Sequence, residues 1–167
     1  VKRRRPVGAS TITQQVAKNF LLSNELSLER KIKEAILALR IERAFSKEQI
    51  LELYLNEIYL GFGSYGVAAA ALNYFNKPLD ELSLAEAAYL AALPKAPNNY
   101  HPIRRYQAAK GRRDWVIGRM VEDGHISAEV AVWARTARLV VRPRSETEFV
   151  TAPFFAEEVR RYLIGRY

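Results

Sequence analysis

The chain contains 167 residues, of which 49% are hydrophobic, 26% are charged and 11% are aromatic. This balance predicts one globular domain with a sizeable core and excludes an intrinsically disordered chain. The absence of cysteine excludes disulfides, thiolate metal sites and cysteine nucleophiles, and two histidines are too few for a histidine-rich metal centre. The 26 Lys and Arg against 18 Asp and Glu give a net charge of +8. That charge predicts an anionic partner: a nucleic acid, an acidic membrane surface or a phosphorylated substrate.

Helix signals dominate the first part of the chain. A capping-box pattern at 11–14 begins a helix, and a long segment free of Gly and Pro predicts a second helix over 27–45. Another capping box at 46–49 begins a helix that runs to about Leu60, where the glycine-rich segment 61–66 ends it.

The elements that follow are also helical. A small-residue helix is predicted over 67–75, and a third capping box at 83–86 begins a helix that ends at Pro94. A basic helix over 103–123 and a shorter helix over 127–135 complete the set. Together these elements predict a mainly α fold.

The composition changes after these helices. Leu139-Val140-Val141 is predicted to form one short strand, 142–151 a linker, and 153–167 an amphipathic helix. We therefore expect a first domain over 1–142, with a linker and the start of a second domain over 143–167.

Glu34 is the first candidate for chemistry. One arc of the helix over 27–45 is apolar, and Glu34 lies off that arc beside further apolar residues, so the helix is predicted to be buried on two sides. Arg30 and Lys31 favour the ionised carboxylate while burial raises its pKa, a balance that suits acid–base or metal chemistry. The alternative is an exposed Arg30–Glu34 pair worth roughly 0.2–0.5 kcal/mol. The apolar arc comprises Leu28, Ile32, Ala35, Ile36 and Leu39.

Two groups of polar residues are candidates for substrate contact. Gln14 and Gln15 either bond sugar hydroxyls and acetamido groups or only cap the start of their helix. Four cations either bind a pyrophosphate or form an ordinary solvated face. These cations are Lys18, Arg30, Lys31 and Lys33.

Other polar features favour structural roles. The glycines of 61–66 do not match a nucleotide-binding fingerprint and favour a turn that packs helix against helix. Asn56 is expected to support the structure, and His101 to be a surface group. The Lys and Arg residues between 104 and 119 predict a solvated face, or a face toward anionic lipid or nucleic acid.

Four segments resemble, in order, the motifs of the family 51 glycosyltransferases. These are the peptidoglycan-polymerising domains of class A penicillin-binding proteins and of monofunctional transglycosylases. The segments are 8–15 (GASTITQQ), 30–34 (RKIKE), 47–66 (KEQILELYLNEIYLGFGSYG) and 86–102 (EAAYLAALPKAPNNYHP). The resemblance covers roughly 8–142.

The resemblance implies a lysozyme-like, mainly α fold that lies against a membrane. It implies that the 4-hydroxyl of an acceptor lipid II attacks the anomeric carbon of the growing glycan chain. Undecaprenyl pyrophosphate leaves, and a β-1,4 bond forms with inversion. One carboxylate takes the hydroxyl proton, and cations or a metal stabilise the leaving group.

The resemblance also assigns roles to individual residues. Glu34 matches a catalytic glutamate that assists the pyrophosphate side, directly or through a divalent cation (Mg²⁺ or Mn²⁺), and no organic cofactor is implied. Metal ligands remain unassigned. The positions that match substrate-contacting residues are Ser10, Gln14, Gln15, Lys18, Arg30, Lys31 and Lys33.

Two departures and one further likeness concern the ends of the chain. The general-base glutamate of the family is expected upstream of Val1, so these residues alone are expected to be inactive. Leu26 stands where many relatives have a basic residue. The segment 151–155 resembles the linker into a transpeptidase domain, which favours a bifunctional parent protein.

The implied setting is the periplasmic face of a bacterial inner membrane, with an upstream transmembrane anchor. The implied partners are lipid II, the growing lipid-linked glycan and the membrane surface, with room for other cell-wall synthesis and division proteins. Two alternatives stay open. A lytic, lysozyme-like enzyme would cleave finished glycan, and a helical nucleic-acid-binding module would show a strongly salt-dependent affinity for duplex DNA.

Overall fold

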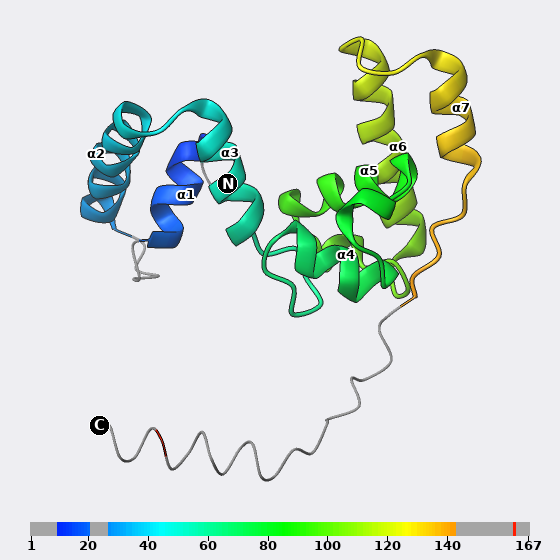
Figure 1. The fold of residues 1–167 in the computed structure, drawn as a ribbon, viewed down its shortest axis with the longest axis horizontal. Coiled ribbons are helices and arrows are strands. Elements are labelled where there is room, and N and C mark those ends of the chain that lie inside the picture. Colours follow the sequence, from blue (N-terminus) through cyan, green and yellow to red (C-terminus); the bar gives the residue numbers. More distant parts are fainter. Residues whose placement is uncertain (1–9, 21–26, 143–161, 163–167) are drawn as a thin grey trace, which may run out of the picture.

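The computed structural model describes residues 10–20, 27–142 and 162 (Figure 1). Some of the predictions fall outside the described residues. They concern Leu26, the segment before residue 10, and the linker, helix and second domain predicted after residue 142, of which only Tyr162 is described.

Seven α-helices and three short 3₁₀ helices form the described part of the chain, which confirms the mainly α prediction. The α-helices are α1 (Ile12–Phe20), α2 (Leu28–Ala44), α3 (Lys47–Glu57), α4 (Val67–Phe75), α5 (Leu84–Ala92), α6 (Tyr106–Glu122) and α7 (Ala128–Thr136). The 3₁₀ helices are η1 (Leu79–Glu81), η2 (Leu93–Lys95) and η3 (Pro97–Tyr100). Within the described ranges, no helix has the length and apolar character needed to cross a membrane.

Side-chain caps determine where several helices begin. The predicted capping boxes at Ser46 and Ser83 are both present, each with its two reciprocal hydrogen bonds. Thr11 and Gln14 form the same reciprocal pair before α1, with both bonds at 3.1 Å. These starts were predictable because a cap involves only residues three positions apart.

The helices form two groups with separate cores (Figure 1). α1, α2 and α3 pack around a mostly aliphatic cluster that also contains Tyr54, and α4, α5 and α6 pack around aromatic residues that include Tyr74, Phe75 and Tyr89. α7 packs on α6 and α5. Ile58, directly after α3, packs against the first two of these clusters, so the end of α3 joins the two groups.

The face of α2 that packs on the core is not its most apolar face. The buried residues are Arg30, Glu34, Ala38 and Ile41. The exposed apolar residues are Leu28, Ile32, Ile36 and Leu39. The sequence predicts that both apolar sides of this helix are buried, which is wrong for the side that carries Leu28, Ile32, Ile36 and Leu39. The other side is buried because α1 and α3 pack their core residues against Ala38.

The basic helix α6 begins at Tyr106 and not, as predicted, at Ile103. The ring nitrogen Nδ1 of His101 accepts hydrogen bonds from the backbone N–H groups of Ile103 and Arg104, at 3.2 and 3.3 Å. This local cap holds the chain in a turn before the helix begins.

The predicted strand at Leu139-Val140-Val141 is absent from the described residues. Leu139 packs into the aromatic-rich core, and the backbone N–H of Arg142 donates to the carbonyl of Tyr74 at 2.8 Å. With no second strand beside it in the described structure, the segment bonds to the end of a helix instead.

The glycine-rich segment after α3 is a tight turn, as the structural interpretation predicted. Tyr59 and Tyr65 form an isolated antiparallel bridge across it, with ring centroids 5.0 Å apart. Gly66 has φ +79° and ψ 156°, a region that essentially only glycine adopts. A Cβ at this position would lie 2.4 Å from the carbonyl oxygen of Asn56, so the turn brings two backbones into contact.

We expect Gly66→Ala to destabilise the protein by more than about 2 kcal/mol, because strained backbone alone costs about 1–3 kcal/mol and the new Cβ displaces the Asn56 carbonyl. Gly63→Ala is the matched control: its φ is +66°, but nothing lies within 4 Å of the added Cβ. Thermal unfolding followed by circular dichroism measures both variants. Equal losses in Tm would contradict the backbone contact at Gly66.

Candidate active site

The start of α2 places a carboxylate and two cations on its first two turns. The hydroxyl of the N-cap, Ser27, accepts from the backbone N–H of Arg30 at 3.1 Å. Arg30 and Lys31 then precede Glu34 by four and three positions, which is within reach on one helix. Glu34 faces the interior of the α1–α3 group and is 1% exposed.

Cations hold both carboxylate oxygens of Glu34. Arg30 Nη1 pairs with Oε1, and Lys31 Nζ donates to Oε2 at 2.6 Å. Lys31 Nζ also lies 3.4 Å from the hydroxyl oxygen of Ser10, so the segment before α1 meets α2 at this point. The Arg30–Glu34 ion pair is present, but both residues are buried. The alternative prediction of an exposed ion pair is therefore wrong.

These surroundings lower the pKa of Glu34. Burial raises the pKa, because it penalises the charged form. The hydrogen bond and charge of Lys31, together with the charges of Arg30 and Lys18, outweigh burial and hold the carboxyl below its ordinary pKa. Glu34 is therefore an anion at neutral pH, which fits a group that holds cations and does not fit a proton donor.

Acid is expected to remove the stabilisation that Glu34 provides. Because its pKa is lower in the folded state, the unfolded state binds the proton first as the pH falls. The stabilisation is complete above the ordinary pKa of 4.5 and is lost as the pH falls through the folded-state pKa. We expect the difference in Tm between the wild type and Glu34→Gln to shrink between about pH 7 and about pH 3. A difference that stays constant would contradict this assignment.

Lys18 and Lys33, two further cations predicted to contact substrate, differ in their placement. Lys18 is exposed on α1 and lies close enough for its charge to lower the pKa of Glu34. Lys33 instead pairs with the exposed carboxylate of Glu29 at 2.5 Å. The structure thus brings Ser10, Lys18, Arg30 and Lys31 toward Glu34 and places Lys33 at a separate pair.

The two glutamines of α1 make local hydrogen bonds. The side-chain carbonyl of Gln14 accepts from the backbone N–H of Thr11, and the side-chain amide of Gln15 donates to the carbonyl of Ser10 at 3.4 Å. The bond at Gln14 agrees with the capping interpretation, while contact of either residue with a sugar stays a prediction.

Arg30 retains a donor that no described residue satisfies. The side chain is only about one-tenth exposed, and its Nε is buried without a hydrogen-bond partner among the described residues. Buried donors in folded proteins normally have an acceptor. An oxygen of a bound anion would supply the acceptor that this nitrogen lacks.

Arg113 departs from the prediction of a solvated basic face on α6. It is fully buried, and its guanidinium donates to the carbonyls of Ala137 at 2.7 Å and Arg135 at 3.0 Å. Ala109 and Ile117, four positions before and after it, are also fully buried. That spacing was the sequence signal that this cation faces inward.

The residues in the described ranges do not fit a divalent cation held by the protein alone. No three His, Cys, Asp or Glu side chains gather there, and cations occupy both oxygens of Glu34. A magnesium ion prefers carboxylate and phosphate oxygens in octahedral geometry.

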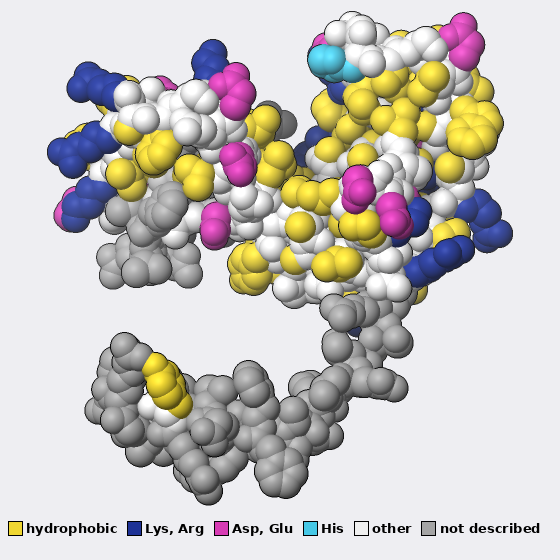
Figure 2. All heavy atoms as spheres, in the orientation of Figure 1, with side chains coloured by type: hydrophobic (Ala, Val, Ile, Leu, Met, Phe, Trp, Pro, Cys, Tyr) yellow, Lys and Arg dark blue, Asp and Glu magenta, His cyan; other side chains and the backbone are white. Residues whose placement is uncertain are grey.

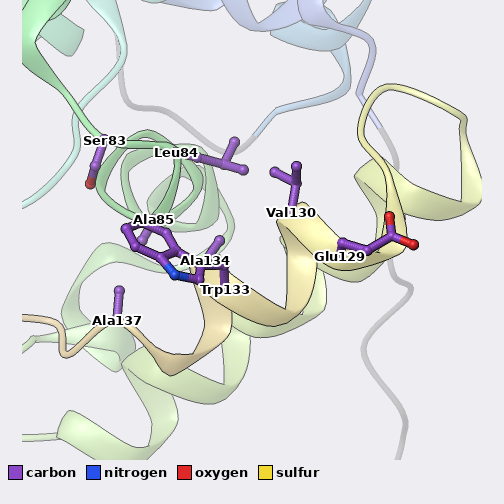
Figure 3. A pocket seen from close by; sticks show the side chains of 8 residues that line it. All are labelled: Ser83, Leu84, Ala85, Glu129, Val130, Trp133, Ala134 and Ala137. Carbon is purple, nitrogen blue, oxygen red and sulfur yellow. The ribbon is translucent and has the colours of Figure 1, made fainter.

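Glu34 lines neither of two hollows that lie beside the described helices. One of about 540 Å³ lies beside the start of α1, where Ile12, Phe45 and Leu51 line it. The other, of about 360 Å³, is an almost entirely apolar hollow between α5 and α7, with Leu84 and Trp133 at its wall (Figure 3). This second hollow belongs to the other helix group. Because Glu34 lines neither hollow, the position of these hollows does not indicate where the candidate active site lies.

Comparisons with known proteins agree on one family. A family model described as Transglycosylase matches residues 1–121. Penicillin-binding protein 1A of Rickettsia felis is 60% identical over 161 residues, which is 96% of this chain and 20% of that protein. Penicillin-binding protein 1A of Escherichia coli K12 is 47% identical over 160 residues, or 96% of this chain and 19% of that protein.

A solved structure gives the same answer for the fold. The crystal structure of penicillin-binding protein 1A from Haemophilus influenzae matches 99% of this chain and 22% of its own chain, with 34% identity and a TM-score of 0.54. The chain spans about a fifth of the length of the curated relatives it matches.

Proposed function

Since this chain belongs to the transglycosylase family, we propose that it polymerises lipid II into β-1,4-linked glycan with release of undecaprenyl pyrophosphate. We further propose that it acts as the glycosyltransferase part of a bifunctional class A penicillin-binding protein. The relatives named penicillin-binding protein 1A support the second statement.

The observation that carries this proposal is the buried carboxylate held between two cations. The reaction breaks the bond between the anomeric carbon and the pyrophosphate, so negative charge grows on the leaving oxygens. Arg30, Lys31 and Lys18 supply positive charge around Glu34, and preorganised charges of this kind stabilise a transition state strongly. The unsatisfied Nε of Arg30 is one donor available to a pyrophosphate oxygen.

The role proposed for Glu34 is to position these cations. Both of its oxygens are engaged and its pKa is lowered, so it is a poor acceptor for the proton of the attacking hydroxyl. That proton goes to a different carboxylate, in line with the sequence expectation of a general base upstream of Val1. The hydroxyl oxygen forms the new bond to the anomeric carbon as the pyrophosphate leaves with the electron pair.

The two alternative functions are not favoured. A lytic, lysozyme-like enzyme is disfavoured by the match to the Transglycosylase family model and by the relatives named penicillin-binding protein 1A. A nucleic-acid-binding module is disfavoured by the family match. The +8 charge fits an anionic lipid-linked substrate equally well.

The setting of the activity belongs to the same proposal. The substrates are lipid II and the growing lipid-linked glycan at the periplasmic face of the inner membrane. A divalent cation and other cell-wall synthesis proteins remain proposed partners of the whole protein.

The choice of substrate tests this function. The full-length protein is incubated separately with purified lipid II and with finished, lipid-free glycan strands, and the products are separated by gel electrophoresis and chromatography. We expect long glycan polymer and free undecaprenyl pyrophosphate from lipid II, and no fragments from finished glycan. Cleavage of finished glycan, or failure to polymerise lipid II, would overturn the proposal.

A further inference from the structure

A third, smaller hollow lies in the group of helices α4–α7, and most of its charged side chains are cations. Its volume is about 140 Å³, well above the about 10–15 Å³ that a single water molecule needs. The residues that line it come from the end of α4, the first turn of α5, α6 and the segment after α7. Four cations and one carboxylate are among them: Lys77, Arg113, Arg138, Arg142 and Glu86. The hollow therefore has room and charge for a small anion.

Two of these cations already have carboxylate partners. Lys77 Nζ donates to both carboxylate oxygens of Glu86 at 2.9 Å. Arg113 Nη2 donates to Oδ1 of Asp114 at 2.7 Å. Glu86 is also held by the capping box at Ser83. The negative charge at this hollow is thus already balanced by Lys77, and Arg113 is balanced by Asp114.

The other two cations have no such partner. The side chains of Arg138 and Arg142 are exposed, and neither forms a hydrogen bond or an ion pair with another described residue. The backbone that carries them is fixed, because Leu139 packs into the aromatic-rich core and the N–H of Arg142 donates to the Tyr74 carbonyl at 2.8 Å. Figure 2 shows basic side chains gathered below α7, where the chain leaves the helices. Two like charges are therefore held beside one hollow without a counter-charge.

The unbalanced charge and the start of α5 favour a phosphate group over a carboxylate. Two positive charges remain at the hollow, and a terminal phosphate carries about −1.5 to −2 at neutral pH. Guanidinium groups bind phosphate oxygens through pairs of parallel hydrogen bonds. Ser83 and Ala85 place the first turn of α5 in the lining, where the helix dipole favours negative charge. A carboxylate would supply only one of the two negative charges.

We propose that this hollow binds a terminal phosphate group, free or at the end of a larger molecule, and that Arg138 and Arg142 hold it. Glu34 and its cations belong to the other helix group, so the site is separate from the pyrophosphate-binding cations of the proposed function and does not depend on that function. A phosphate bound here joins the segment after α7 to the start of α5, because each contributes to the lining.

Chemical modification of arginine in the full-length protein tests the proposal without a substitution. The protein is treated with phenylglyoxal in a neutral detergent, and the rate at each arginine is measured by peptide mass spectrometry. Arg104 is the internal control, because it is exposed and its side chain has no partner among the described residues. We expect inorganic phosphate to slow the modification of Arg138 and Arg142 by about fivefold at about four times its Kd, and to leave Arg104 unchanged.

Two further additions identify the ligand. Glycerophosphoglycerol is the water-soluble phosphodiester headgroup of a phospholipid, and sodium chloride at equal ionic strength reports charge screening. Protection by inorganic phosphate, with weaker or no protection by the diester, supports a terminal phosphate. Protection by the diester alone assigns the hollow to a lipid headgroup and contradicts the proposal. Equal protection by chloride, equal protection of Arg104, or no protection at all also contradicts it.

Calorimetric titration with inorganic phosphate then locates the binding. The double variant Arg138→Met with Arg142→Met is compared with Lys31→Met, which removes a cation beside Glu34. We expect the wild type and Lys31→Met to share a phosphate-binding event that the double variant lacks, while circular dichroism shows that all three are folded. If Lys31→Met loses the event and the double variant keeps it, phosphate binds beside Glu34 and the proposal fails, whereas the proposed polymerisation of lipid II is unaffected.

Discussion

Glu34→Gln is expected to lower the rate of lipid II polymerisation by on the order of 10²–10³-fold. Gln keeps the size of the side chain but removes the negative charge that holds Arg30 and Lys31 in place. The cations then repel each other and no longer meet the pyrophosphate in a fixed arrangement. The measurement is the initial rate of glycan formation by the full-length protein.

Two further variants separate this role from an effect on folding. Asp114→Asn is the matched control, because Asp114 is also a carboxylate held by two cations, Lys110 and Arg113, but in the other helix group. It is expected to lose stability and keep its turnover. Lys31→Met removes a half-exposed partner of Glu34 and is expected to reduce turnover while the protein stays folded. If the Asp114 and Glu34 variants lose activity equally, the positioning role of Glu34 fails.

Arg113→Met is expected to destabilise the protein by about 3–5 kcal/mol, the usual cost of removing one partner from a buried ion pair. The guanidinium is fully buried, and it satisfies the carbonyls at the end of α7 as well as the carboxylate of Asp114. Met fills a similar volume but leaves all three acceptors without this donor. Chemical denaturation followed by circular dichroism measures the loss.

Arg119→Met provides the comparison on the same helix. Arg119 also pairs with two carboxylates, those of Glu122 and Asp123, but its side chain is 47% exposed. Exposed pairs contribute little, so the expected loss is within about 1 kcal/mol. If both variants lose the same stability, the buried contacts of Arg113 do not hold α7 to α6.

The features that the sequence predicts well are those set by neighbouring residues. The capping boxes at Ser46 and Ser83, and the turn at Gly66, depend on residues a few positions apart, so their patterns are visible in the chain itself. The family was also predictable, because four motifs in one order over about a hundred residues are far more specific than composition.

Features that depend on distant packing were not predictable. The helical wheel of α2 shows two apolar sides, and nothing local decides which of them packs on α1 and α3. Arg30 and Glu34 are buried because each neutralises the other, an outcome that hydrophobicity alone does not rank. Arg113 is buried for a related reason, since α7 supplies carbonyl acceptors from more than twenty residues away. Contact with substrate remains a prediction for all of the matched positions, which are Ser10, Gln14, Gln15, Lys18, Arg30, Lys31 and Lys33.

The junction at the end of α3 has a consequence for folding cooperativity. Ile58 serves two cores at once, and α3 meets α4 through a small contact. Units that share little buried surface exchange their amide protons with separate opening free energies. In the described part of the chain, α1–α3 and α4–α7 therefore correspond to two such units. The unit that carries Glu34 can open locally while the aromatic core around Tyr89 stays intact.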